Sequence, residues 1–124
     1  MTLQHIVLFS YPEELSDEDA TEMRRQVQEW PSVIPGFRAL RFGRDLTEAR
    51  TRGYQYLLYT EFDDVDALHA YQQHPVHQEF LAWVIAHECT PLAFDYHLDD
   101  ETVFPLTNPH DGPTRLGLTS HEGE

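Results

Sequence analysis

Residues 3–11 restrict the fold more than any other part of the chain, because they form a strand pattern that is apolar on both faces. Successive side chains of a β-strand point to opposite faces, so His5, Val7 and Phe9 share one face. Ile6 and Leu8 then share the other face. At 124 residues the chain forms one domain with a small core. The sequence therefore predicts a strand whose two faces are both covered.

Hydrophobic periodicity and capping residues predict the remaining elements. The first helix begins at the N-cap residue Ser16, carries an apolar residue every three or four positions, and ends at about Trp30, ahead of Pro31. The other predicted elements are strands over residues 37–44, 54–62 and 91–96 and helical segments over 65–71 and 75–87.

The resulting order is β-α-β-β-α-β, which predicts an α+β, ferredoxin-like fold with a four-stranded antiparallel sheet. In this arrangement the helices cover only one face of the sheet, yet the strands carry apolar residues on both faces. We therefore expect a second copy of the chain to cover the other face, giving a homodimeric α+β barrel.

The charge of the chain narrows its partners. A net charge of −14 argues against binding to nucleic acid or to anionic membrane surfaces, whose phosphates would be repelled. All eight basic residues are arginine, so neither a lysine Schiff base nor a P-loop lysine is available. Cys89 is the single cysteine, which excludes an intrachain disulfide and is compatible with a reducing cytoplasm. With no signal-peptide or transmembrane pattern, the cytoplasm is the predicted location.

The composition changes at the end of the predicted domain, which spans residues 1–97. Residues 98–124 carry six acidic side chains against one arginine and are rich in proline and glycine. Such a composition favours a flexible tail or an extended arm. Residues 103–106 are the apolar part of this segment and are a possible docking point for a partner subunit or a pocket mouth.

The segment around Tyr71 and His77 carries the strongest chemical signal. Proline is favoured at the first helical position, so Pro75 places His74 at the cap and His77 in the first turn of a helix. The positive end of the helix dipole disfavours a charged imidazole there. A neutral imidazole beside a phenol is a workable proton-transfer pair near pH 7.

Four short motifs in this order resemble the stress-responsive A/B barrel (Dabb) family of dimeric α+β barrels, over about residues 1–97. They are His5-Ile6-Val7-Leu8-Phe9, Ile34-Pro35-Gly36, Tyr71-x-x-His74-Pro75-x-His77 and Phe94-Asp95-Tyr96. Enzymes of this family are polyketide cyclases that close a ring by aldol chemistry on a small ketone-bearing substrate, with neither a metal nor an organic cofactor.

The resemblance implies that His77 is the base, Tyr71 the hydrogen-bond donor, and His5 a residue that orients either group or polarises a carbonyl. It also implies a substrate pocket between the helices and the sheet. The pocket residues expected on this basis are Met23, Arg24, Val27, Leu58, His74, Phe80, Leu81 and Trp83. Several of them differ from the plant cyclase of the family, so that enzyme's substrate is not expected here.

Other functions stay open at this stage. Related barrels include cofactor-free monooxygenases of phenolic substrates, and some family members are stress-responsive proteins without an assigned activity, compatible with a small-molecule-binding dimer. The same residues also have structural explanations: His74 can shape the turn, His77 can bond a backbone carbonyl, and Tyr71 can belong to the core. The histidines lack the spacing of a strong metal motif, so no metal site is predicted.

Overall fold

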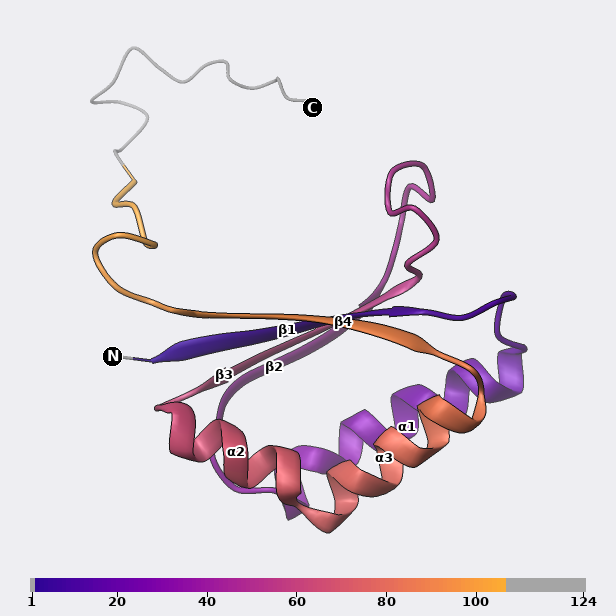
Figure 1. Cartoon of the computed structure of the whole chain (residues 1–124), viewed down its shortest axis with the longest axis horizontal. Coiled ribbons are helices and arrows are strands. Elements are labelled where there is room, and N and C mark those ends of the chain that lie inside the picture. The colour runs from indigo at the N-terminus through magenta and orange to yellow at the C-terminus, as the bar shows by residue number, and fades with distance from the viewer. Residues whose placement is uncertain (1, 107–124) are drawn as a thin grey trace.

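The computed structural model describes residues 2–106, which form one four-stranded antiparallel sheet with three helices on one side of it (Figure 1). The elements are β1 (Leu3–Ser10), α1 (Asp17–Val33), β2 (Phe37–Arg44), β3 (Tyr56–Phe62), α2 (Val65–Gln73), α3 (Pro75–Ala86) and β4 (Thr90–His97). The strand order β2-β3-β1-β4 is that of a ferredoxin-like fold, and the predicted fold class is confirmed.

The element bounds agree with the prediction to within one residue except at three places, the first of which is α2, which ends two residues later than predicted. The prediction that the first helix ends ahead of Pro31 is wrong, because α1 continues through this proline to Val33. A proline lacks the backbone N–H and its ring crowds the carbonyl four residues earlier, but only two residues follow Pro31 in α1, so the disturbance is limited to the end of the helix. The N–H of Ile34 still donates to the Trp30 carbonyl at 2.7 Å and closes the helix. In addition, β3 begins at Tyr56, two residues later than predicted.

The face of the sheet that the helices cover holds the core. Odd-numbered residues of β1 point to the helices, and Leu3, Val7 and Phe9 are buried there. Trp30 of α1 is fully buried and packs edge-on against Phe80 of α3, with ring centroids 5.0 Å apart. Trp30 also stacks on Phe37 of β2, with ring centroids 6.3 Å apart, and this contact ties the helical layer to the sheet.

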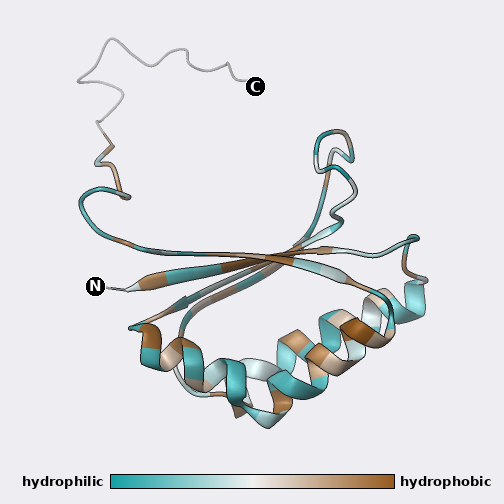
Figure 2. Ribbon diagram, in the orientation of Figure 1, coloured by the Kyte–Doolittle hydropathy of each residue, from teal (hydrophilic) through white to brown (hydrophobic). Residues whose placement is uncertain are grey.

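The opposite face of the sheet is open in the single chain. Ile6 and Leu8 of β1 are only half-buried on this side. Leu92 and Phe94 of β4 are 51% and 68% exposed. Figure 2 shows hydrophobic stretches along the strands although helices cover only one side of the sheet. The sequence predicts that both faces of β1 are covered, but in the single chain only the face toward the helices is.

The chain beyond β4 begins with a tight turn. The N–H of Leu98 donates to the Thr2 carbonyl at 2.8 Å, and Asp99 accepts from the N–H groups of Glu101 and Thr102. The segment then rises on the side of the sheet away from the helices (Figure 1). The rest of the predicted tail, residues 107–124, lies outside the described residues.

Candidate functional site

A cavity of about 280 Å³ lies between the helical layer and the covered face of the sheet. His5 reaches it from β1, Tyr71 from α2 and His77 from α3. The structure thus brings together the three side chains that the sequence analysis selected. The remaining lining residues are Val7, Phe9, Leu58, Gln72, Gln78, Phe80, Leu81, Pro91 and Ala93.

Tyr71 is held rigidly and yet lacks a partner for its hydroxyl. The side chain is 1% exposed, and its ring packs against Trp30 and Phe62 with centroids 5.6 and 5.1 Å away. Its hydroxyl is buried without a hydrogen bond to any described residue. Burial raises the pKa of Tyr71 above its ordinary value, so the phenol stays protonated at neutral pH. Tyr71 is therefore a hydrogen-bond donor facing a cavity.

His77 lies beside this phenol, with ring centroids 4.3 Å apart. Its Nδ1 lies 3.2 Å from the carbonyl oxygen of Gln72. A carbonyl can only accept, so Nδ1 carries the hydrogen and Nε2 carries the lone pair in the neutral ring. The pKa of His77 is lowered, mainly by burial and also by the neighbouring His5 and His74, against the opposing bond from Gln72. The imidazole is thus neutral and available as a base near pH 7.

His5 is held by a carboxylate that the sequence analysis did not select as a site residue. Its Nδ1 lies 2.5 Å from Oδ1 of Asp95, which pairs directly opposite His5 on β4. The carboxylate accepts, so Nδ1 is the donor, and whenever the ring is neutral Nε2 is its acceptor. The His5 ring stands edge-on to Tyr71, with centroids 6.0 Å apart. The register of β1 against β4 was the signal that could have revealed Asp95.

The other predicted pocket residues divide into two groups. Leu58, Phe80 and Leu81 line the cavity. His74 does not, because it joins α2 to α3 and its Nδ1 accepts the N–H of Val76 at 3.1 Å. It therefore has the capping role that the sequence analysis considered for it.

The predicted residues of α1, and Trp83 of α3, also lie away from the cavity. Met23 and Val27 belong to the buried core and are not among the residues that line the cavity. Arg24 is exposed, with its guanidinium 5.7 Å from the centroid of the Phe42 ring. Trp83 stacks on the His87 ring at 4.0 Å. The apolar stripe of α1 packs on the sheet, so this helix supplies no side chain to the cavity.

Two glutamines at the cavity were not anticipated. The side-chain amide of Gln78 donates to the Gln72 carbonyl at 2.6 Å, the same oxygen that holds His77. Both residues line the cavity next to exposed surface. In the sequence they are polar helix residues with no feature that separates them from solvated ones.

Two further findings concern metals and membranes. Within residues 2–106, no three metal-binding side chains gather in one place. In the same part of the chain, every helix is too short or too polar to cross a bilayer.

The fold and the site together define a class of protein. It is a ferredoxin-like α+β domain in which two histidines and a tyrosine line a cavity between the helices and the sheet. Residues 3–98 match the family of the stress responsive A/B barrel domain, Dabb, and the chain belongs to that family.

Similar proteins include enzymes and a dimer. Olivetolic acid cyclase of Cannabis sativa is 22% identical over 81 residues, which cover 64% of this chain and 80% of that protein. A dimeric ferredoxin-like protein of unknown function from Thermobifida fusca has a TM-score of 0.70 and 26% identity, covering 79% of this chain and 92% of its own. The hydroxynitrile lyase of Passiflora edulis shares the fold with a TM-score of 0.71 at 20% identity, covering 84% and 97% of the two chains.

Proposed function

We propose that this protein is a cofactor-independent cyclase that closes a ring by aldol-type chemistry on a small polyketide-like substrate. The observation that carries the proposal is the unpartnered, buried hydroxyl of Tyr71 beside a neutral His77 at one cavity. Leaving a polar group buried without a partner costs about 1–3 kcal/mol. A substrate oxygen in the cavity would supply the missing partner.

In the proposed reaction, His77 moves one proton from a carbon of the substrate to an oxygen of the product. Nε2 of His77 takes a proton from the carbon between two carbonyl groups, and Tyr71 donates a hydrogen bond to the developing enolate oxygen. The resulting carbanion attacks a third carbonyl carbon, farther along the same chain, and forms the ring bond. The alkoxide left on that carbon takes the proton back from the imidazolium. Loss of water from this aldol product then gives the unsaturated ring.

His5 is assigned a supporting role in the same cavity. With Nδ1 fixed by Asp95, its Nε2 can accept a hydrogen bond from a substrate hydroxyl or enol. The apolar lining around it, from Val7, Phe9 and Leu58, strengthens electrostatic contacts with the reacting atoms by excluding water.

The size of the cavity restricts the substrate. About 280 Å³ is just below the range of roughly 300–1,000 Å³ that is typical of a small-molecule site. A product with a single ring and a short side chain fits this volume better than a fused polycycle. Its closing atoms would lie between Tyr71 and His77.

The proposal includes a homodimer formed through the open face of the sheet. The exposed apolar side chains of Leu92 and Phe94 need a cover, and the Thermobifida fusca relative is dimeric. Light scattering is expected to give about twice the chain mass of 14.5 kDa. A monomer at micromolar concentration would contradict the dimer without bearing on the chemistry of the cavity.

The chemistry is tested on its first step and on the whole reaction. The probe is a linear 3,5,7-triketo thioester with a short alkyl chain, with α-proton exchange in D₂O followed by NMR and ring closure followed by ultraviolet absorbance. We expect both rates to fall about 10²–10⁴-fold in His77→Ala. The matched control is His87→Ala at the end of the same helix, which should leave both rates unchanged.

Each alternative has a distinct outcome in this experiment. Exchange no faster with the wild-type protein than with His77→Ala would contradict the role of the base. Tight binding of the probe without exchange would favour a small-molecule-binding dimer. Oxygen uptake with a phenolic substrate, without ring closure, would instead indicate a monooxygenase.

A further inference from the structure

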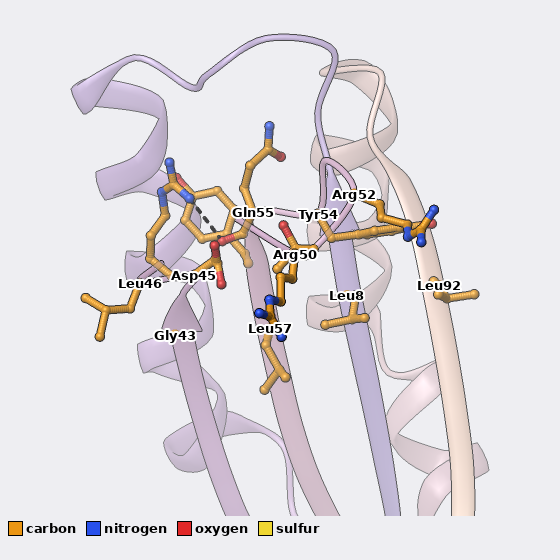
Figure 3. A pocket seen from close by; sticks show the side chains of 13 residues that line it. Leu8, Gly43, Asp45, Leu46, Arg50, Arg52, Tyr54, Gln55, Leu57 and Leu92 are labelled. Carbon is orange, nitrogen blue, oxygen red and sulfur yellow. Dashed lines mark hydrogen bonds between the residues drawn. The ribbon is translucent and has the colours of Figure 1, made fainter. Parts of the chain in front are cut away.

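A second and larger cavity of about 560 Å³ lies on the open face of the sheet, beneath the loop that joins β2 to β3. Its floor is one cross-strand row, in which Leu57 of β3 and Leu92 of β4 flank Leu8 of β1. Figure 3 shows these leucines with Arg50 and Arg52 of the loop beside them. We refer to it as the arginine-rimmed cavity.

The charge of this cavity differs from that of the whole chain. Arg44, Arg50 and Arg52 line it against one acidic residue, Asp45, so its lining carries a charge of +2 (three minus one). The chain as a whole carries −14. Arg44 is already paired with Glu14 at 2.7 Å. The cavity therefore has an apolar floor on the sheet and a rim that is basic relative to the rest of the chain.

The segment that follows β4 has the complementary composition. We define the C-terminal arm as residues 98–106, most of which follow the part that matches the family. It begins with the acidic residues Asp99, Asp100 and Glu101 and ends with exposed apolar ones. Phe104 is 74% exposed and Leu106 is 94% exposed.

The arm and the loop over the cavity project on the same side of the sheet, at its opposite ends (Figure 1). The arm is fixed at its start, because the hydroxyl of Thr102 donates to the His97 carbonyl at 2.7 Å. From Thr102, two residues reach at most ~7 Å to Phe104. Along β4, Leu92 lies five residues before His97, the residue to which Thr102 is bonded, and is therefore ~17 Å from it. The arm therefore cannot fill the cavity of its own chain.

We propose that the C-terminal arm of one protomer seats Phe104 in the arginine-rimmed cavity of the other protomer. Two sheets that pack face to face, with the two-fold axis crossing the strands, bring each arm to the partner's loop. Asp100 and Glu101 then approach the basic rim while Phe104 covers the leucine floor. This inference rests on the proposed dimer and is independent of the proposed catalysis.

Cross-linking in the full-length chain tests the placement. Cys89 is replaced by alanine, and cysteines are introduced as Phe104→Cys on the arm and Leu46→Cys at the cavity, where Leu46 is 91% exposed. A short bis-maleimide is expected to give a covalent dimer in this pair. The control pair, Phe104→Cys with Ile85→Cys, carries the second thiol on an exposed position of α3 and should stay uncoupled, as should each single-cysteine variant.

Every other outcome overturns the proposal in an identifiable way. A dimer by light scattering without the cross-link would leave the dimer standing and place the arm elsewhere. A product of monomer mass in which one linker bridges both thiols, identified by mass spectrometry, would place the arm in its own chain. A monomer by light scattering would remove the dimer and the arm's site together.

The strength of the dimer gives a second, independent measurement. Removing most of a buried phenylalanine side chain in Phe104→Ala should raise the dimer dissociation constant at least about tenfold. Ile85→Ala removes a similarly exposed apolar side chain from the helical layer and should leave the constant unchanged. Equal constants for the two variants would overturn the proposal even if the cysteine variants fail to fold.

Discussion

The two faces of the sheet carry different kinds of cavity. The face beneath the helices encloses about 280 Å³ with two histidines and a tyrosine, whereas the open face has about 560 Å³ over leucines and arginines. On the covered face, the polar groups are buried and oriented by neighbours such as Gln72 and Asp95. On the open face, Leu92 and Phe94 lie exposed.

This difference indicates how one strand can serve two purposes. In β1, His5 points to the covered face while Ile6 and Leu8 point to the open one. Chemistry needs polar groups held in a dry site, and assembly needs apolar area that a partner can cover. Alternation along a strand separates the two requirements, so a substitution on one face should leave the function of the other intact.

Among the substitutions that separate the two faces, Tyr71→Phe gives the largest expected effect, and it bears on the covered face alone. Loss of the donor should lower turnover about 10²–10³-fold. Stability should rise by about 1 kcal/mol, because a buried hydroxyl without a partner disappears. Chemical denaturation and the exchange assay measure the two quantities. The control is Tyr11→Phe, which removes a hydroxyl that is bonded to Sδ of Met23 and should leave turnover unchanged. A loss of stability in Tyr71→Phe would mean that the Tyr71 hydroxyl has a hydrogen-bond partner.

Phe94→Glu is the corresponding test of the open face. The substitution places a charge where an exposed phenylalanine would be covered, and a symmetric dimer contains it in both protomers. The dimer dissociation constant should therefore rise by at least about a hundredfold. Sedimentation equilibrium gives this constant. Val65→Glu on α2, 43% exposed, is the matched control and should leave it unchanged. If both variants stay dimeric, the open face is not the interface.

Asp95→Asn should have a smaller effect on catalysis. The substitution keeps the shape but removes the charge from the bond to His5, and a bond to a charged group is worth about 1.5–3 kcal/mol. Turnover should fall roughly 10–100-fold, since 1.36 kcal/mol corresponds to tenfold. The dimer constant should not change. An unaltered rate would mean that His5 only packs against Tyr71.

The smallest effect is the pH dependence of stability due to His77. Its pKa is lowered in the folded protein, so the unfolded chain binds more protons at acid pH. The stability due to this group is therefore complete above the unfolded pKa of about 6.5 and is lost as pH falls below it. Denaturation at several pH values should show a shallower acid slope in His77→Gln than in the wild type. The exposed His69→Gln should retain the full slope; equal slopes in both variants would contradict the burial of His77.

The fold could be predicted from the sequence because its signals are local. Strand alternation, the Ser16 cap and the position of Pro75 each act over a few residues, and β2 spans the predicted residues 37–44. The end of α1 was misjudged, since proline was treated as a stop and not as a residue tolerated in a last turn. The local pattern thus defines the elements better than their ends.

The site was less predictable because it depends on how distant segments meet. Tyr71 and His77 form a local motif, but periodicity does not place His5 beside them, and the family resemblance was needed for that. Asp95 required the register of β4 against β1. Met23 and Val27 were expected at the pocket because they match positions that line the pocket of the plant cyclase of the family, but here they lie in the buried core and not at the cavity.

The break between α2 and α3 has a geometric consequence for the pair that faces the cavity. In one continuous helix, residues six apart are separated by about 9 Å along the axis and by about 240° around it, so Tyr71 and His77 would diverge. His74 adopts an extended conformation, with φ −65° and ψ 136°, which the following proline favours. The two side chains meet at 4.3 Å because the chain turns a corner at this one residue. The angle at that corner sets how far apart the phenol of Tyr71 and the imidazole of His77 lie at the cavity.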